Sequence, residues 1–240
     1  MSAYYIASCV FTSRYPQLSL RIQRYIRERH GLDIVRCCVP RYKITEFEER
    51  MPDGLCRDSW RALPDSAPFA PGDDVYSLCH NCNNIIEEMH SGVRVHSLWE
   101  LIDRDASFPL PDLAGVRMTV QDCWRAKDRR EEQEAVRSLL RKMRAEIVEL
   151  EGAQRTDFCG ASLYRSQPPR NPKLAPKHYV EAAAGKFVPH TEEEQVRIMR
   201  EYCGRFRTER VVCYCHYCLE GLQMSDRIEA RHIAQLVFPE

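Results

Sequence analysis

Two short segments of the sequence each place two cysteines around a histidine, in the order Cys-His-x-Cys. The first is VYSLCHNCNNI, with Cys79 and Cys82, and the second is VVCYCHYCLEG, with Cys215 and Cys218. Two thiolates at this spacing can bind one metal centre, and free amides at a helix N-terminus would favour their anionic form. The motif therefore predicts metal or redox chemistry at two places in the chain.

Each half of the chain also carries cysteines far from its Cys-x-x-Cys pair. The first half adds Cys9 and the adjacent pair Cys37 and Cys38, and the second half adds Cys123 and Cys159. Four thiolates satisfy zinc, and iron–sulfur clusters also need thiolate cages. Five cysteines in the first half exceed what zinc or an ordinary cubane cluster needs, which makes the two halves different.

Composition limits the classes of protein to which the chain can belong. Its 240 residues contain twelve cysteines, 35 basic and 35 acidic residues, and 44% apolar residues. A net charge of zero argues against nucleic-acid binding, and no apolar run has the length of a membrane span. The N-terminus does not read as a signal peptide, so we expect a soluble, cytoplasmic protein. Reduced cysteines that bind metal are then favoured over the alternative, a disulfide scaffold.

The order of apolar segments and breakers repeats along the chain. An apolar run at 4–12 precedes a helix-like segment at 16–31, and a run at 116–124 precedes a helix-like segment at 129–146. Both halves then end alike, because the same offset of 136 residues relates Cys79 to Cys215 and His96 to His232. We therefore predict two repeats, 1–108 with the five-cysteine site and 109–240 with the four-cysteine site.

Alternating strands and helices predict an α/β fold of two tandem pseudo-symmetric repeats, each a small parallel sheet with flanking helices. Sites in such sheets lie at the carboxyl ends of strands, where most of these cysteines fall. Two segments fit the repeat less well. Residues 161–181, with four prolines, predict an extended loop, and residues 191–204 predict a helix that begins with a capping box from Thr191 to Glu194.

The cysteine pattern Cys-x(n)-Cys-Cys-x(n)-Cys-x-x-Cys resembles the CCG-domain family, also called cysteine-rich domains, over nearly the whole chain. The best-known member is the heterodisulfide reductase subunit that carries this domain twice. The resemblance implies a noncubane [4Fe-4S] cluster in the first half, held by Cys9, Cys37, Cys38, Cys79 and Cys82. It also implies disulfide reduction, or electron relay, in a complex with flavin-containing and ferredoxin-like electron-donor subunits.

The second half departs from the family pattern. Phe158 occupies one of the two positions that adjacent cysteines fill in the first half. The family pattern has a glycine after this pair. Gly160 matches that glycine in the second half, whereas Val39 replaces it in the first half. Four matching cysteines remain, and they suit a [4Fe-4S] cluster or a zinc ion: Cys123, Cys159, Cys215 and Cys218. Cys213 is a candidate fifth ligand only if the end of its strand is irregular.

Several other residues have a functional and an ordinary interpretation. His80 is the candidate proton donor to a departing thiolate, while His80 and His216 could instead orient the neighbouring thiolates by hydrogen bonding. We expect Cys56 and Cys203 to be packed cysteines, and His96 and His232 to pack or cap locally. The basic residues of the proline-rich segment are either a solvated loop or a contact for an anionic thiol substrate: Arg170, Lys173 and Lys177.

Three hypotheses follow for function. The first is an oxidoreductase subunit that reduces a disulfide, with a small thiol or disulfide as substrate. The second is a non-catalytic electron carrier, and the third is a zinc-binding structural or redox-sensing protein. The chain has no ferredoxin-type cysteine run and no Gly-x-Gly-x-x-Gly fingerprint, so electrons would have to come from another protein.

Overall fold

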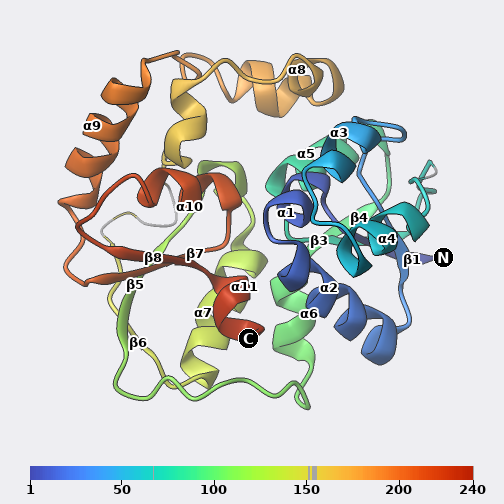
Figure 1. Cartoon of the computed structure of the whole chain (residues 1–240), viewed down its shortest axis with the longest axis horizontal. Coiled ribbons are helices and arrows are strands. Elements are labelled where there is room, and N and C mark those ends of the chain that lie inside the picture. Colours follow the sequence, from blue (N-terminus) through green and yellow to red (C-terminus); the bar gives the residue numbers. More distant parts are fainter. Residues whose placement is uncertain (67, 151, 153–155, 240) are drawn as a thin grey trace. The chain divides into compact units, whose positions relative to one another are not determined.

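A computed structural model describes residues 1–66, 68–150, 152 and 156–239 (Figure 1). The chain divides into two compact units, Met1–Leu98 and Trp99–Glu240. Each unit contains one four-stranded sheet in which all strands are parallel. The boundary that the sequence repeat predicts, after residue 108, lies beyond this division and stays a prediction about the limits of the repeats.

The first unit is built on a sheet with the strand order β2-β1-β3-β4. Its strands are β1 (Ala3–Ile6), β2 (Asp33–Val35), β3 (Asp74–Ser77) and β4 (Arg94–Ser97). Its helices are α1 (Cys9–Arg14), α2 (Pro16–Tyr25) with the π-helical turn η1 (Ile26–His30), α3 (Ile44–Glu49), α4 (Leu55–Ala62) and α5 (His80–Met89). Helix α6 (Leu98–Arg104) begins at the last residue of this unit.

Local sequence explains the longest helical segment of the first unit. Pro16 opens α2, because its fixed φ suits the first helical turn and its missing N–H is not needed there. Leu18, Ile22 and Ile26 lie on one face and are all buried. Gly31 ends the segment in the left-handed conformation, with φ of 62°, which costs glycine little.

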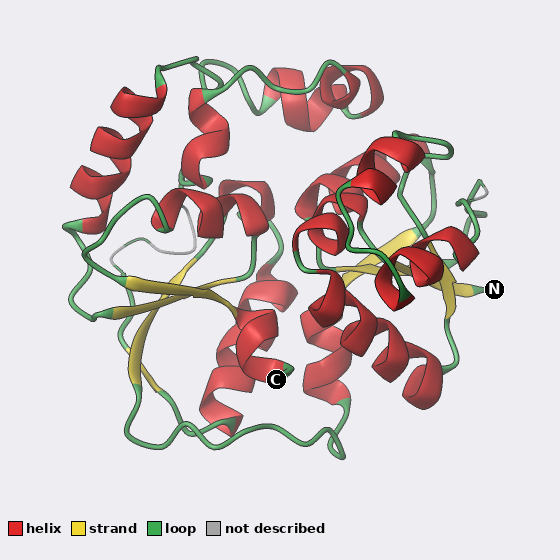
Figure 2. Ribbon diagram, viewed as in Figure 1, coloured by secondary structure: helices red, strands yellow, loops and turns green. Residues whose placement is uncertain are grey.

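The second unit repeats this plan with the strand order β6-β5-β7-β8. Its strands are β5 (Arg117–Gln121), β6 (Glu146–Ile147), β7 (Arg210–Cys213) and β8 (Glu229–His232). Its α-helices are α7 (Arg130–Lys142), α8 (Arg170–Leu174), α9 (Glu192–Cys203), α10 (His216–Leu222) and α11 (Ile233–Val237). Its 3-10 turns are η2 (Trp124–Ala126) and η4 (Gly160–Tyr164), and η5 (Lys177–Glu181) is π-helical. Figure 2 shows helices around each sheet.

The fold class predicted from the sequence is confirmed: two tandem α/β repeats, each with a parallel sheet and flanking helices. The capping box also forms, since the Thr191 side chain accepts from the Glu194 amide while the Glu194 carboxylate accepts from the Thr191 amide. The prediction of an extended loop at 161–181 was wrong. Three short helical turns form there, η4, α8 and η5, because each proline sits at or near the start of a turn, where its missing N–H costs nothing.

No helix among the described residues is long and apolar enough to cross a membrane.

Candidate metal centre

Four cysteines of the second unit are positioned by the ends of its central strands. Cys123 follows β5 and precedes η2, and Cys159 immediately precedes η4. Cys215 is the N-cap residue of α10, and Cys218 lies in the first turn of that helix. Because β5 and β7 are paired and parallel, the segments that follow them begin at the same edge of the sheet.

The sulfur atoms of these four cysteines all lie within 4.8 Å of one another. The Sγ atoms of Cys123 and Cys159 are 3.4 Å apart, and all four residues are at most 3% exposed. Among the described residues, this is the one group of three or more histidines, cysteines or acidic residues with such mutual distances. Four converging thiolates fit the donor set of a zinc ion or of a [4Fe-4S] cluster, so this group could bind a metal.

Two glycines bring Cys159 close to α10. Gly160 has φ of +57°, and a Cβ atom built on it would lie 2.0 Å from the Tyr217 carbonyl oxygen. On the facing helix, a Cβ on Gly221 would lie 2.5 Å from the Gly160 Cα atom. Only glycine permits this approach of two backbones, and the approach sets the distance between Cys159 and Cys218.

A buried ionic network lies directly behind two of the cysteines. Asp122 precedes Cys123 and accepts hydrogen bonds from Tyr214 Oη at 2.6 Å and from Arg137 Nη2 at 2.7 Å. Arg137 also donates to Glu149 at 2.7 and 2.9 Å. Asp122 and Tyr214 are fully buried, and Tyr214 precedes Cys215. The network therefore ties together the segments that carry Cys123 and Cys215.

Arg125 contacts the sulfur group directly. Its Nη1 donates to Cys159 Sγ and, at 3.1 Å, to Ser162 Oγ. The guanidinium carbon lies 5.2–5.9 Å from the centres of four aromatic rings, those of Trp124, Tyr179, Phe187 and Tyr217. Arg125 is only 5% exposed, so a cation is buried beside a cysteine sulfur.

The thiols of this group differ in acidity. Burial raises the pKa of Cys123 and of Cys218, and hydrogen bonds with Cys159 and Cys215 raise both values further. For Cys159, burial acts to raise the pKa, but hydrogen bonds from Cys123 and Cys218 and the positive charge of Arg125 outweigh it and lower the pKa. Cys159 therefore ionises more readily than Cys123 or Cys218.

The five predicted ligands of the first unit are all buried, at most 4% exposed, but they are less tightly grouped. The Cys37 thiol donates to Cys9 Sγ at 3.4 Å. Cys82 is hydrogen-bonded to Cys38 and Cys79, and these bonds, ahead of burial, raise its pKa. Since Cys37 and Cys38 are adjacent in sequence, they link the two sets of contacts into one cysteine-rich region.

Three further residues of the first unit are associated with these cysteines. Tyr5 on β1 is 1% exposed, and burial, followed by the charges of Cys82 and Cys79, raises its pKa. Ser8 precedes Cys9 with φ of 62°, a conformation that costs a residue with a side chain about 1–3 kcal/mol. His80, the candidate proton donor, is the first residue of α5 and is 2% exposed.

The remaining sequence predictions have clear positions. Cys213 lies outside the group of four sulfurs, and its thiol contacts the carbonyl oxygens of Cys215 and Arg231 at 3.7 Å, so it does not join the group as a fifth cysteine. Cys56 and Cys203 are buried on α4 and α9. His232 caps α11 by accepting from the Ala234 amide, and His96 is 2.7 Å from Asp74 Oδ1.

Sequence reasoning missed three residues around the second group: Asp122, Arg125 and Tyr214. A charged residue next to a predicted ligand, as in Asp122-Cys123, is a signal that could have been noticed. The contact of Arg125 with Cys159 could not, because the two residues are brought together only by the turn at η4.

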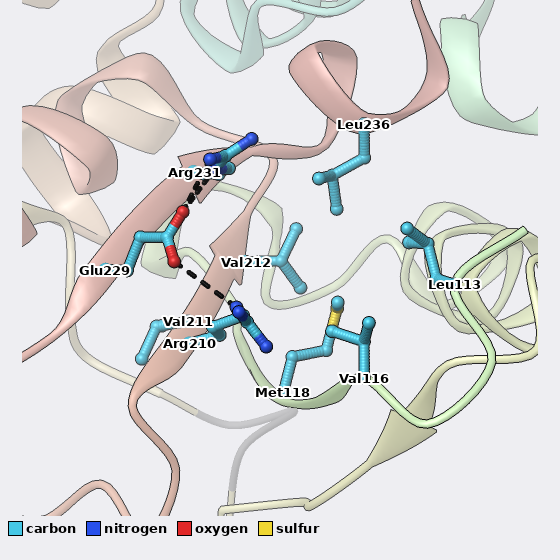
Figure 3. A pocket seen from close by; sticks show the side chains of 9 residues that line it. All are labelled: Leu113, Val116, Met118, Arg210, Val211, Val212, Glu229, Arg231 and Leu236. Atoms are coloured by element: carbon cyan, nitrogen blue, oxygen red, sulfur yellow. Dashed lines mark hydrogen bonds and ion pairs between the residues drawn. The ribbon is translucent and has the colours of Figure 1, made fainter. Parts of the chain in front are cut away.

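A separate cavity of about 300 Å³ lies on the sheet of the second unit (Figure 3). Figure 3 shows an apolar side formed by Leu113, Val116, Met118, Val212 and Leu236, and an ion-paired side formed by Arg210, Glu229 and Arg231. None of the four clustered cysteines lines it, so it is separate from the candidate metal centre.

No family model and no curated protein matches this chain. Among solved structures, the chain is similar to glutamate racemase isoform RacE1 from Bacillus anthracis, with 11% sequence identity and a TM-score of 0.34. The similarity covers 99% of this chain and 78% of that chain. At this TM-score the similarity carries no argument about fold or function, which must come from the site itself.

Proposed function

We propose that this chain is an iron–sulfur redox protein that holds one metal centre in each unit and works in thiol–disulfide chemistry with partner proteins. The observation that carries this proposal is the convergence of four buried cysteine sulfurs in the second unit. The cysteine-rich region of the first unit, at the same end of an equivalent sheet, supports it.

Buried donors on the two residues that follow Cys123 favour an iron–sulfur cluster over a zinc ion. Arg125 Nε and Trp124 Nε1 are buried and have no hydrogen-bond acceptor among the described residues. A buried donor without an acceptor costs free energy. Inorganic sulfide would add acceptors to the site, whereas a zinc ion with four thiolates would add none. Cys123, Cys159, Cys215 and Cys218 would hold the group.

In the first unit, five cysteines and a wider spread of sulfurs suit a larger group than a zinc ion. The proposed group is the noncubane [4Fe-4S] cluster of the CCG-domain family, held by Cys9, Cys37, Cys38, Cys79 and Cys82. When bound, such clusters supply transfer of one electron at a time.

The proposed reaction is the reduction of a disulfide by two electrons and two protons to give two thiols. The electrons would come singly from partner proteins of the flavin-containing and ferredoxin-like classes. His80, buried next to Cys79, would hold the proton that a departing thiolate takes up. A chain that only relays electrons would use the same cysteines without this proton transfer.

A zinc-binding structural or redox-sensing protein is the second candidate. The four mutually close sulfurs of the second unit favour it, since four thiolates complete the coordination of zinc. The five cysteines of the first unit do not favour it, because one of them would have no place on the metal.

The test is the content of iron, sulfide and zinc per chain after anaerobic purification, with electron paramagnetic resonance on the same sample. About eight irons and no zinc would support clusters in both units, and about four irons with one zinc would limit redox chemistry to the first unit. Zinc alone, from protein never exposed to oxygen, would overturn the proposal.

Matched variants assign the metal to a unit. Cys82→Ser should remove the iron of the first unit only, and Cys218→Ser the metal of the second unit only. Cys56→Ser and Cys203→Ser are the controls, because these buried cysteines belong to neither group and should leave the metal content unchanged. A loss of both centres in either single variant would contradict independent sites.

A further inference from the structure

Arg125 occupies an unusual environment for a cation. Its guanidinium is enclosed by the rings of Trp124, Tyr179, Phe187 and Tyr217 and is almost fully buried. Among its described hydrogen bonds, the ones it donates go to Cys159 Sγ and Ser162 Oγ. Cation–π contact with four rings offsets part of the cost of burial, and a negatively charged sulfur would offset much of the rest.

The charge of a loaded site explains why such a cation is useful. Four thiolates around a divalent ion leave a net charge of −2, and burial makes that charge costly. A positive group in contact with one sulfur halves this net charge. The aromatic rings keep water away, so the attraction is weakened less than it would be at the surface.

We propose that Arg125 is a positioning residue for the second metal centre: it fixes the Cys159 sulfur and offsets the negative charge of the loaded site. This inference rests on the proposed metal binding by the four cysteines, and it holds for an iron–sulfur cluster or for a zinc ion. It assigns a function to a residue that is not itself a ligand.

The hydrogen bonds of one guanidinium nitrogen, Arg125 Nη1, support this role. One end of the guanidinium holds Cys159 Sγ and Ser162 Oγ, while Ser162 Oγ donates to the Cys159 carbonyl at 2.8 Å. Arg125 therefore fixes both the side chain and the backbone of Cys159, the cysteine that begins the tight turn at Gly160. A lysine could supply the charge, but its ammonium is more strongly hydrated and lacks the planar face that suits an aromatic enclosure.

The chain offers a matched control in Lys186. Its Nζ lies 5.4 Å from the Trp124 ring, so it contacts the same aromatic wall, but it pairs with Asp157. Among the described interactions of Lys186, none is with a cysteine. Lys186→Met removes the same charge from the same wall without touching a sulfur.

The experiment is a Co²⁺ titration of the reduced, metal-free full chain, read by the thiolate-to-cobalt absorption. The signal of the second centre is the part that Cys218→Ser removes. We expect Arg125→Met to weaken Co²⁺ binding there by about 10–100-fold, the usual effect of losing a group that orients a ligand. Arg125→Lys should recover part of this loss, and Lys186→Met should bind like the unchanged protein.

Three outcomes would overturn the inference. Unchanged Co²⁺ affinity in Arg125→Met would do so, as would equal losses in Arg125→Met and Lys186→Met, or an Arg125→Lys variant no better than Arg125→Met. Circular dichroism of each metal-free variant checks that the fold is kept. A different result, in which the unchanged chain gives no signal sensitive to Cys218→Ser, would instead overturn the proposed metal site itself.

Discussion

The two cysteine groups occupy equivalent positions in the two repeats, but they differ in the number of cysteines that the middle of each repeat contributes. In the second unit, one cysteine from the middle of the repeat, Cys159, is hydrogen-bonded to Cys123, Cys215 and Cys218. In the first unit, two adjacent cysteines make the corresponding contacts: Cys37 contacts Cys9, and Cys38 contacts Cys82. One cysteine gives a compact group of four sulfurs, and two adjacent cysteines spread the contacts over a wider region.

The strand that leads to each group differs as well. Tyr4 on β1 pairs with Val75, and Thr119 on β5 pairs with Val211, the residue equivalent to Val75 in the repeat. Cys9 is the fifth residue after Tyr4, whereas Cys123 is the fourth after Thr119. The first unit therefore has one extra residue before its cysteine, and Ser8, with its positive φ, takes up the extra length.

The supports behind the sulfurs differ in polarity. Asp122 and Tyr214 precede Cys123 and Cys215 and bond to each other, while Ser8 and Leu78 precede Cys9 and Cys79. The second group is thus held by a buried ionic network and a buried cation. Differences of this kind show that the two repeats place their thiols alike but support them with different residues.

The largest effect should come from exchanging Val39 and Gly160, which occupy matching positions after the middle cysteines. Gly160→Val places a branched side chain at a left-handed φ and against the Tyr217 carbonyl oxygen. We therefore expect the free energy of unfolding to fall by about 4–6 kcal/mol and the second unit to lose its metal. Val39 is half-buried and its φ is not positive, so Val39→Gly should cost only about 1 kcal/mol.

Urea unfolding and metal content measure both variants. A folded Gly160→Val protein that keeps its second metal would show that the close approach of η4 to α10 is not needed for the site. Equal decreases in the free energy of unfolding for Gly160→Val and Val39→Gly would contradict the difference between the two turns that the structure shows.

The buried network gives the next effect. Asp122→Ala leaves Arg137 buried at the site without its inner partner, and breaking such a pair costs about 3–5 kcal/mol. Arg117→Met removes an exposed pair with Glu146 on the same sheet and should cost less than about 1 kcal/mol. Urea unfolding measures both variants. Similar decreases in the free energy of unfolding for Asp122→Ala and Arg117→Met would mean that the network does not support the segments that carry Cys123 and Cys215.

Phe158 stands where the family pattern has a cysteine, and its ring stacks on Tyr202 with centres 4.1 Å apart. Phe158→Cys should cost about 2–4 kcal/mol, because the contact is lost and a cavity remains. It should not enlarge the metal group, since Cys159 already contacts the other sulfurs. Iron per chain checks this, and a rise above the unchanged protein would show that Phe158 alone separates the two kinds of site.

The sequence was sufficient for the fold class, because strand, helix and breaker signals recur in the same order in both halves. It also named all four cysteines of the compact group. Cys123 ends a strand-like run, Cys215 and Cys218 form a Cys-x-x-Cys motif, and Cys159 matches the paired cysteines of the first half. It was insufficient for Arg125, whose contact with Cys159 depends on the path of the chain around Gly160. It likewise mistook the proline-rich segment for an extended loop, because prolines at turn starts and prolines in loops look alike in sequence.

The smallest effect concerns the charges that join the last two strands of each unit. Asp74 on β3 pairs with Arg94 on β4, whereas the equivalent pair of the second unit, Arg210 and Glu229, has the opposite order of charge. Hydrogen bonds from Arg94 and then His96 outweigh burial and lower the pKa of Asp74 to about 2 from an ordinary value of 3.8.

A carboxylate with a lowered pKa stabilises the folded state above its ordinary pKa, and the stabilisation is lost as the pH falls through the folded value. The contribution of Asp74 should therefore be complete above about pH 5 and disappear between about pH 4 and pH 2. Because its partner Arg94 is half exposed, we expect only about 1 kcal/mol. The measurement is the difference in the free energy of urea unfolding between the unchanged protein and Asp74→Asn at each pH. Because both proteins have the same cysteines, the effect of acid on the thiolates cancels in this difference. Glu229→Gln, whose carboxylate also has a lowered pKa, is the counterpart in the second unit. A difference for Asp74→Asn that stays constant from neutral pH to pH 2 would show that its loss acts through packing and not through charge.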